Sequence, residues 1–176
     1  MVVADISAAA YNSIAHDIGE APVKLIFFLG LGVAMVAGDA EAAMHWRWRC
    51  AGPEFEAKGE FTTESKPGLD GFYSITGITG EANGVPIIGV QPTKTAIPGN
   101  AGWPVDNLIR AAKPQLSPGG FGFALADGSF ANPFFGEHSD PTGFLAVVSD
   151  PARHVWREPR IYFEAVRSSG PRRPRL

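Results

Sequence analysis

The chain has 176 residues, of which 45% are hydrophobic and 19% are charged, and its formal net charge is −3. This length is typical of one domain, and the nearly balanced charge argues against a dedicated nucleic-acid-binding protein. A single cysteine excludes an internal disulfide framework, and the composition excludes a coiled coil, collagen or a disordered charged chain.

The first predicted element is the uncharged hydrophobic segment 25–37, which follows Lys24. As a helix it would be about 20 Å long, too short to cross a hydrocarbon core of about 30 Å. Ala40 and Ala42 form the small-x-small pattern of a signal-peptidase site, which predicts an N-terminal hydrophobic signal helix cleaved after Ala42. The chain is thereby divided into an N-terminal extension with its signal peptide (1–42), a β-domain (43–168) and a disordered basic tail (169–176).

The expected location is secreted or periplasmic, with no stable membrane span after processing. Residues 1–22 hold three acidic residues and no lysine or arginine, whereas a secretory signal begins with positive charge. We therefore hypothesise that translation starts at Val23, directly before the basic residue that precedes the hydrophobic segment.

Strands are expected throughout the β-domain. Trp46, Trp48 and Cys50 alternate with basic residues, so they would share one buried face of a strand at 45–50. Apolar and charged residues alternate in the same way over 55–64. Further predicted strands lie at 72–80, 85–90, 105–110, within a hairpin over 121–135, and at 144–148 and 160–166.

The connections between these strands carry clear turn signals. Asn83-Gly84 and Asp127-Gly128 predict tight hairpin turns. The alternation shifts at Gly77, where we expect a β-bulge. Pro86 cannot donate a ladder hydrogen bond and predicts that its strand lies at a sheet edge, while residues 91–104 read as a long loop rich in proline and glycine.

Seven or eight short strands without sustained helical periodicity predict an all-β fold. The architecture is expected to be an antiparallel β-sandwich or a partly closed barrel. Only residues 105–113 would accommodate a helical turn. Cys50, between apolar neighbours on one strand face, is expected to be a small buried side chain.

Several short motifs stand out in the middle of the chain: YSITGITG at 73–80 within the run 71–90, AIPGN at 96–100, VDNL at 105–108, FGFALADG at 121–128 and NPFF at 132–135. In these motifs the chain resembles the uncharacterised β-rich domains of many exported bacterial proteins, some of which end in a PEP-CTERM sorting tail. The resemblance covers about residues 55–136 and implies export and a β-domain without an assigned activity. Residues 169–176 contain three arginines and no Pro-Glu-Pro motif, so surface anchoring is not expected.

Two groups of residues are candidates for a site. His138, Asp140 and His154 have the side chains of a metal site, although they also fit solvated loops. Trp103, Phe134 and Phe135 are candidate ligand-binding residues because flat rings pack on sugar faces, although aromatic residues more often pack in cores. Trp103 is the strongest of these, because it lies in the long loop and binding residues concentrate on loops.

The sequence contains no phosphate-binding loop, dinucleotide fingerprint, nucleophile elbow or zinc-protease motif, so we predict neither a cofactor nor catalysis. The leading hypothesis is an exported non-catalytic β-domain with a structural or ligand-binding role. The alternatives are a carbohydrate-binding module that contacts extracellular polysaccharide, and a metal-dependent hydrolase that uses the two histidines and the aspartate named above.

Overall fold

The computed structural model describes residues 42–68, 70–158 and 160–168. Within these ranges the chain forms ten β-strands and no helix, which confirms the all-β prediction. No helix in the described part of the chain is long and apolar enough to cross a membrane. The expected signal helix at 25–37 and the expected tail at 169–176 lie outside the described residues.

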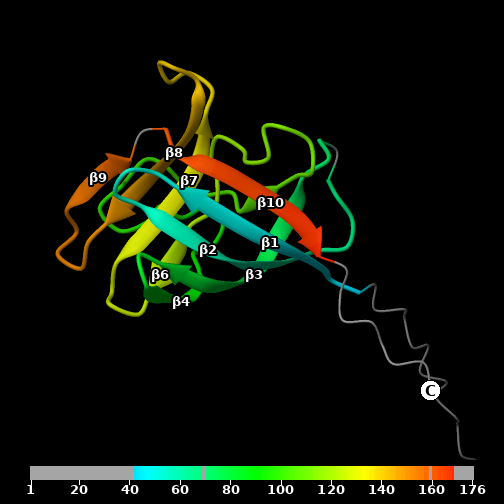
Figure 1. Ribbon diagram of the computed structural model, residues 1–176, viewed down its shortest axis with the longest axis horizontal. Coiled ribbons are helices and arrows are strands. Elements are labelled where there is room, and N and C mark those ends of the chain that lie inside the picture. Colours follow the sequence, from blue (N-terminus) through cyan, green and yellow to red (C-terminus); the bar gives the residue numbers. More distant parts are fainter. Residues whose placement is uncertain (1–41, 69, 159, 169–176) are drawn as a thin grey trace, which may run out of the picture. The chain divides into compact units, whose positions relative to one another are not determined.

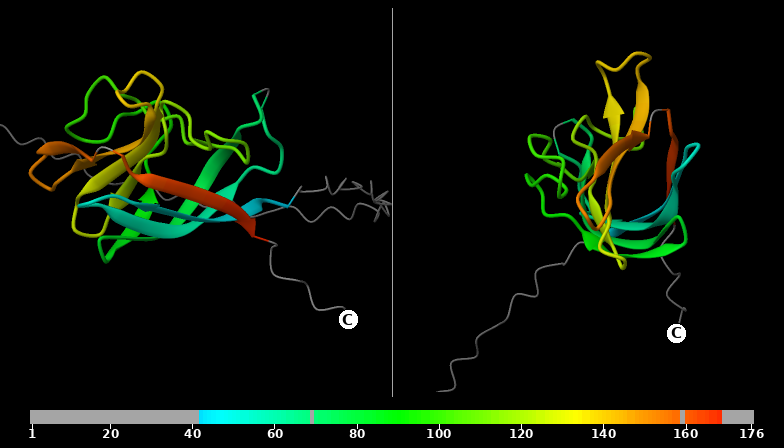
Figure 2. Two further views of the ribbon diagram at one scale, coloured as in Figure 1. Left: turned by 45° about the horizontal axis from the view of Figure 1, so that its top comes forward. Right: turned by 90° about the vertical axis from the view of Figure 1, so that its left-hand side faces the viewer.

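The strands form one antiparallel sheet in the order β10-β1-β2-β3-β4-β6-β7-β8-β9, and β5 pairs with β3 off this path. The sheet curls into a half-barrel, as Figures 1 and 2 show. The strands are β1 (Met44–Ala51), β2 (Glu56–Thr63), β3 (Tyr73–Ala82), β4 (Val85–Val90), β5 (Leu108–Ile109), β6 (Phe123–Leu125), β7 (Phe130–Gly136), β8 (Gly143–Ser149), β9 (Val155–Glu158) and β10 (Tyr162–Ser168).

The last two strands connect the two ends of the curled sheet. β9 pairs with β8, and β10 pairs with β1, where His45 lies opposite Ser168. Between them, the N–H of Ile161 donates to the carbonyl of Phe144 over 2.9 Å, so the chain still follows β8 just before β10 begins. Arg160, in the bend, has a φ of 59°. A strand that changes partners at a bend in this way turns the corner of a curled sheet.

The outer edge of β10 is occupied by a side chain. The amide of Gln115 donates from Nε2 to the carbonyl of Ala165 over 2.7 Å and accepts the N–H of the same residue at Oε1 over 3.0 Å. Gln115 is buried. One amide thus takes the place of a neighbouring strand, and it satisfies backbone groups that an open sheet edge would expose.

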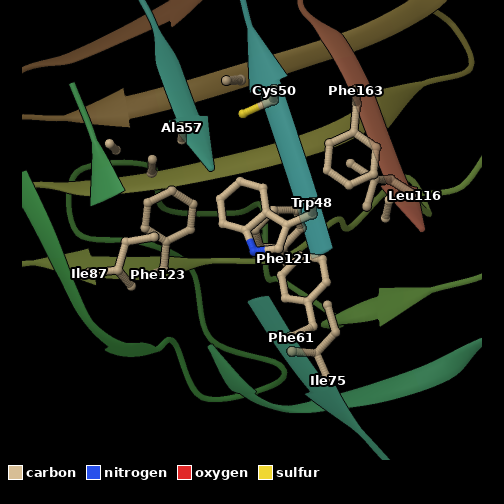
Figure 3. Close-up of a cluster of buried hydrophobic side chains, with 14 of the residues drawn as sticks. Trp48, Cys50, Ala57, Phe61, Ile75, Ile87, Leu116, Phe121, Phe123 and Phe163 are labelled. Atoms are coloured by element: carbon tan, nitrogen blue, oxygen red, sulfur yellow. The ribbon is translucent and has the colours of Figure 1, made fainter. Parts of the chain in front are cut away.

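The concave side of the sheet holds an aromatic core (Figure 3). Trp48 of β1 stacks on Phe61 of β2, with 5.1 Å between ring centroids and 7° between planes. The ring of Phe121 stands edge-on to both, at 5.2 Å and 4.8 Å. Trp48 and Cys50 are almost fully buried, as the alternation over 45–50 predicts, and so are Phe61 and Phe121. Offset and edge-on ring pairs add to the stabilisation from burial itself.

Local turn signals agree with the structure. Asn83 and Gly84 have φ angles of 48° and 79°, the two left-handed residues of a tight hairpin between β3 and β4. Thr62 lies opposite Gly77, but Thr63 lies opposite Ile75, so one residue of β3 is extra at this point. The predicted bulge beside Gly77 is confirmed.

The prediction that Pro86 marks a sheet edge is wrong, because β4 lies between β3 and β6. The proline is the second residue of β4, and its carbonyl accepts the N–H of Ala126 where β6 ends, so the sheet continues past it. The strand predicted over 105–110 is reduced to β5, Leu108–Ile109. In addition, β9 at Val155–Glu158 was not expected from the sequence.

Cys50 offers a test of the core. Burial raises the pKa of its thiol to about 12, and the thiolate is the reactive form. We expect a thiol reagent at pH 8 to label the folded protein slowly and the urea-unfolded protein rapidly, as followed by intact mass. Labelling of the folded protein at the unfolded rate would contradict this packing.

Candidate functional site

Strands β7, β8 and β9 present a second face, directed away from the aromatic core. Asn132, Val147 and Arg157 lie opposite one another across the three strands, and Phe134 lies opposite Leu145. Because side chains alternate between the faces of a strand, these five share one face. Their sequence neighbours on β7 and β8 pack into the aromatic core instead.

The long predicted loop brings Trp103 to this face. Two backbone hydrogen bonds, from Lys94 to Val105 (2.8 Å) and from Val105 to Thr95 (2.9 Å), tie the two ends of the loop together. Trp103 lies beyond this closure, and 59% of its surface is exposed. The loop is thus a closed structure, with the indole two residues from its closure.

Asn107 fastens the loop to the sheet. Its Nδ2 donates to the carbonyl of Gln91 (2.7 Å) and to Oγ1 of Thr93 (3.1 Å), and its Oδ1 accepts the N–H of Gly122 (3.1 Å). The backbone carbonyl of Asn107 accepts the N–H of Ile75 on β3. The residue is buried and has a φ of 55°, which asparagine tolerates better than most residues.

A second polar contact fixes the neighbouring segment. The hydroxyl of Ser117 donates to the carboxylate of Asp106, and burial raises the pKa of that carboxyl although this hydrogen bond partly offsets the effect. Nδ2 of Asn132 donates to the carbonyl of Gly119 over 3.1 Å. Pro118, between these two anchors, is therefore held beside the face of β7.

These segments enclose a cavity of about 250 Å³, which we call the Trp103 cavity. Its volume is slightly below the range of about 300–1,000 Å³ typical of small-molecule sites. A narrow extension of about 20 Å³ shares four of its wall residues and adds Asn100 and Asn132. The cavity itself is bordered by Trp103, Pro118, Phe134, Phe135, Gly136, Glu137, His138, Ser139, Leu145 and Arg157.

The structure brings together two of the three predicted aromatic residues. Trp103 and Phe134 both line the Trp103 cavity and its extension. Phe135 also borders the cavity, but its ring packs edge-on against Phe144, at 5.3 Å and 66°, next to the aromatic core. Adjacent residues of a strand point to opposite faces, so Phe134 and Phe135 do not form one platform.

The three candidate metal ligands do not meet. His138 and Asp140 lie in the loop between β7 and β8, whereas His154 follows β8 at its other end. That strand is about 20 Å long at the usual rise per residue. Nδ1 of His154 lies 2.9 Å from Oδ2 of Asp150, and among the described residues no three His, Cys, Asp or Glu side chains are grouped as metal ligands.

A larger hollow, of about 450 Å³, lies over the outer face of β10, β1 and β2. It is lined mainly by charged side chains, several of which are engaged in ion pairs. Arg49 pairs with Glu164 (3.2 Å), and Lys58 pairs with Glu81 (3.1 Å). The Trp103 cavity has the better wall for a ligand, because it combines exposed aromatic surface with polar groups.

Arg157 and the anchoring asparagines were missed in the sequence. Arg157 lies on β9, which has only four residues and carries two charges. The alternation of Val155 and Arg157 with Trp156 and Glu158 was the available signal, but four residues are too few to separate a strand from a loop. The roles of Asn107 and Asn132 depend on partners distant in the sequence.

No family model matches the chain, and neither a curated protein nor a solved structure matches it. The similarity to exported bacterial β-rich domains stays a prediction. Function is therefore inferred from the chemistry of the Trp103 cavity.

Removing the Asn107 amide tests whether it holds the loop. Asn107→Gly keeps a residue that tolerates the positive φ but deletes three side-chain hydrogen bonds. We expect the free energy of unfolding, measured in urea, to fall by about 2–4 kcal/mol. Thr142→Ala, at an exposed hydroxyl, is the control and should cost less than about 0.5 kcal/mol. Equal stability of the two variants would contradict the anchoring role.

Proposed function

We propose that residues 43–168 form a non-catalytic carbohydrate-binding domain whose site is the Trp103 cavity. The observation that carries this proposal is an indole with 59% of its surface exposed beside a second ring, Phe134, at the mouth of a cavity. Large exposed apolar groups at such a place mark ligand sites. The flat face of an indole also matches the C–H-rich face of a sugar ring.

The polar residues around the cavity suit sugar hydroxyl groups. Arg157 supplies donors only and Glu137 supplies acceptors, while Ser139, whose hydroxyl already donates to the carbonyl of Gly136, supplies a further acceptor. In the extension, the side chain of Asn100 adds an amide donor and acceptor. The volume of about 250 Å³ favours one sugar unit held in the cavity, with the rest of an oligosaccharide outside.

The site is preorganised for binding. The loop that carries Trp103 is anchored through the buried amide of Asn107, and Pro118 is held by the Asp106–Ser117 and Asn132–Gly119 contacts. A ligand that binds to residues already held in place loses less free energy to ordering the protein.

The carboxylate content of the cavity supports binding without hydrolysis. Glycosidases canonically use a pair of carboxyl groups on either side of the scissile bond. Among the described residues that border the Trp103 cavity, Glu137 is the one carboxylate. The domain would therefore hold a sugar chain and leave it intact.

Mutation of Trp103 tests the site. We expect Trp103→Ala to weaken binding of the best ligand by about tenfold or more, because exposed aromatic anchors dominate such sites. Titration calorimetry with cellohexaose, xylohexaose, chitohexaose and oligogalacturonate measures the affinities. Trp156→Ala is the matched control, since Trp156 is also exposed but lies on the other face of β9. Binding to none of the four probes, or equal loss in both variants, would overturn the proposal.

We also propose that the domain is exported after cleavage behind Ala42. Support comes from the hydrophobic segment 25–37 and from the position of Ala42, which is exposed and precedes β1 by two residues. A peptidase cut there leaves every strand whole.

Expression of the full chain in a Gram-negative bacterium tests this. We expect a periplasmic product whose N-terminus, read by Edman sequencing, is Ala43. Ala40→Lys with Ala42→Lys should block processing, because signal peptidases require small residues at these positions. Recovery of the uncut chain in the cytosol would contradict export.

A further inference from the structure

Resting on the proposed carbohydrate-binding function, we infer that the Trp103 cavity selects an acidic sugar unit, whose carboxylate or sulfate group is bound by the guanidinium of Arg157.

Arg157 lies at the border of the Trp103 cavity. It projects from β9 on the same face as Val147, the buried residue opposite it on β8. It borders both the cavity and the narrow extension, as do Trp103 and Phe134. A sugar ring lying against Trp103 would therefore have the guanidinium at its rim, on the side of the extension.

The guanidinium of Arg157 is not engaged by the part of the chain that the structure describes. Arg157 has no ion pair, hydrogen bond or ring contact from its side chain within the described residues. Four other arginines do lie over aromatic rings: Arg49 over Tyr162, Arg110 over Phe72, Arg153 over Phe130, and Arg167 over Trp46 and Tyr73. Its planar donors remain available for a two-point contact with a carboxylate or a sulfate.

Glu137 is the one carboxylate among the described residues that border the cavity. Glu137 comes directly after Gly136, the last residue of β7. Arg157 of β9 lies opposite Val147 of β8, which in turn lies opposite Asn132 of β7. Gly136 is four residues along β7 from Asn132, a rise of about 14 Å in the backbone. No ion pair joins the Glu137 and Arg157 side chains in the described part of the chain. Glu137 therefore leaves the site at Arg157 attractive to an anion and fits the neutral hydroxyls of the same chain.

A pair of ligands that differ only in charge tests the inference. Trigalacturonic acid and its methyl ester have the same rings, but only the first carries carboxylates. We expect calorimetry in 50 mM NaCl to show the acid binding about tenfold or more tighter than the ester. The ratio should decrease at 500 mM NaCl because salt screens the ion pair. Maltotriose sulfate and neutral maltotriose form a second pair, which tests whether a sulfate group raises the affinity as a carboxylate does.

Variants assign the effect to one residue. Arg157→Gln should reduce the ratio of acid to ester affinity to about one while the ester still binds. Arg47→Gln, at an exposed arginine of β1 outside the cavity, should leave the ratio unchanged. Trp103→Ala should weaken acid and ester alike. Circular dichroism melts confirm that each variant folds.

The outcomes separate the two proposals. Preference for either anionic probe that is lost in Arg157→Gln supports the inference. Equal binding of charged and neutral probes, still dependent on Trp103, overturns the acidic-sugar inference and leaves carbohydrate binding intact. Failure of these four probes to bind overturns the acidic-sugar inference, and if cellohexaose, xylohexaose, chitohexaose and oligogalacturonate also fail to bind, both proposals are overturned.

Discussion

The whole candidate site depends on one buried amide. A loop of the length of 91–104 leaves many backbone groups without strand partners, and buried groups of this kind must be satisfied. Backbone hydrogen bonds within the loop satisfy several of these groups, and Asn107 joins the loop to the sheet, reaching the carbonyl of Gln91 at the start of the loop and the N–H of Gly122 beside β6. Because the same residue is bonded to β3 through its carbonyl, the loop and the sheet behave as one body. Trp103 is therefore presented at a fixed place.

Strands β7 and β8 contribute to both the site and the core. One face of these strands borders the cavity, and the opposite face packs into the core. Phe134 faces the Trp103 cavity, and Phe135, the next residue, packs against Phe144 beside the aromatic cluster. The shape of the Trp103 cavity therefore depends on how the opposite face of β7 packs in the core. Close-packed interiors transmit small changes in volume, so a core substitution under β7 would alter the site without touching it.

Local sequence signals predicted the features whose causes are local. The Asn83-Gly84 turn and the alternation at 45–50 depend on a few consecutive residues, and both agree with the structure. β9 forms because it pairs with β8 at the edge of the sheet. A short stretch of the sequence does not reveal such a partner. The site divides in the same way, since Trp103 was recognisable from its loop, whereas Arg157 acquires its place only through the pairing of β9 with Val147.

The pairing of β1 with β10 has a mechanical consequence. The start of β1 and the end of β10 are neighbours, with His45 opposite Ser168. Tension applied to the chain before β1 and after β10 would separate the two strands from that end. Their hydrogen bonds would break one after another, rather than all together as in shear. The domain would yield at low force, and once β10 is released the load on that side would pass directly along the chain to β9, the strand that carries Arg157.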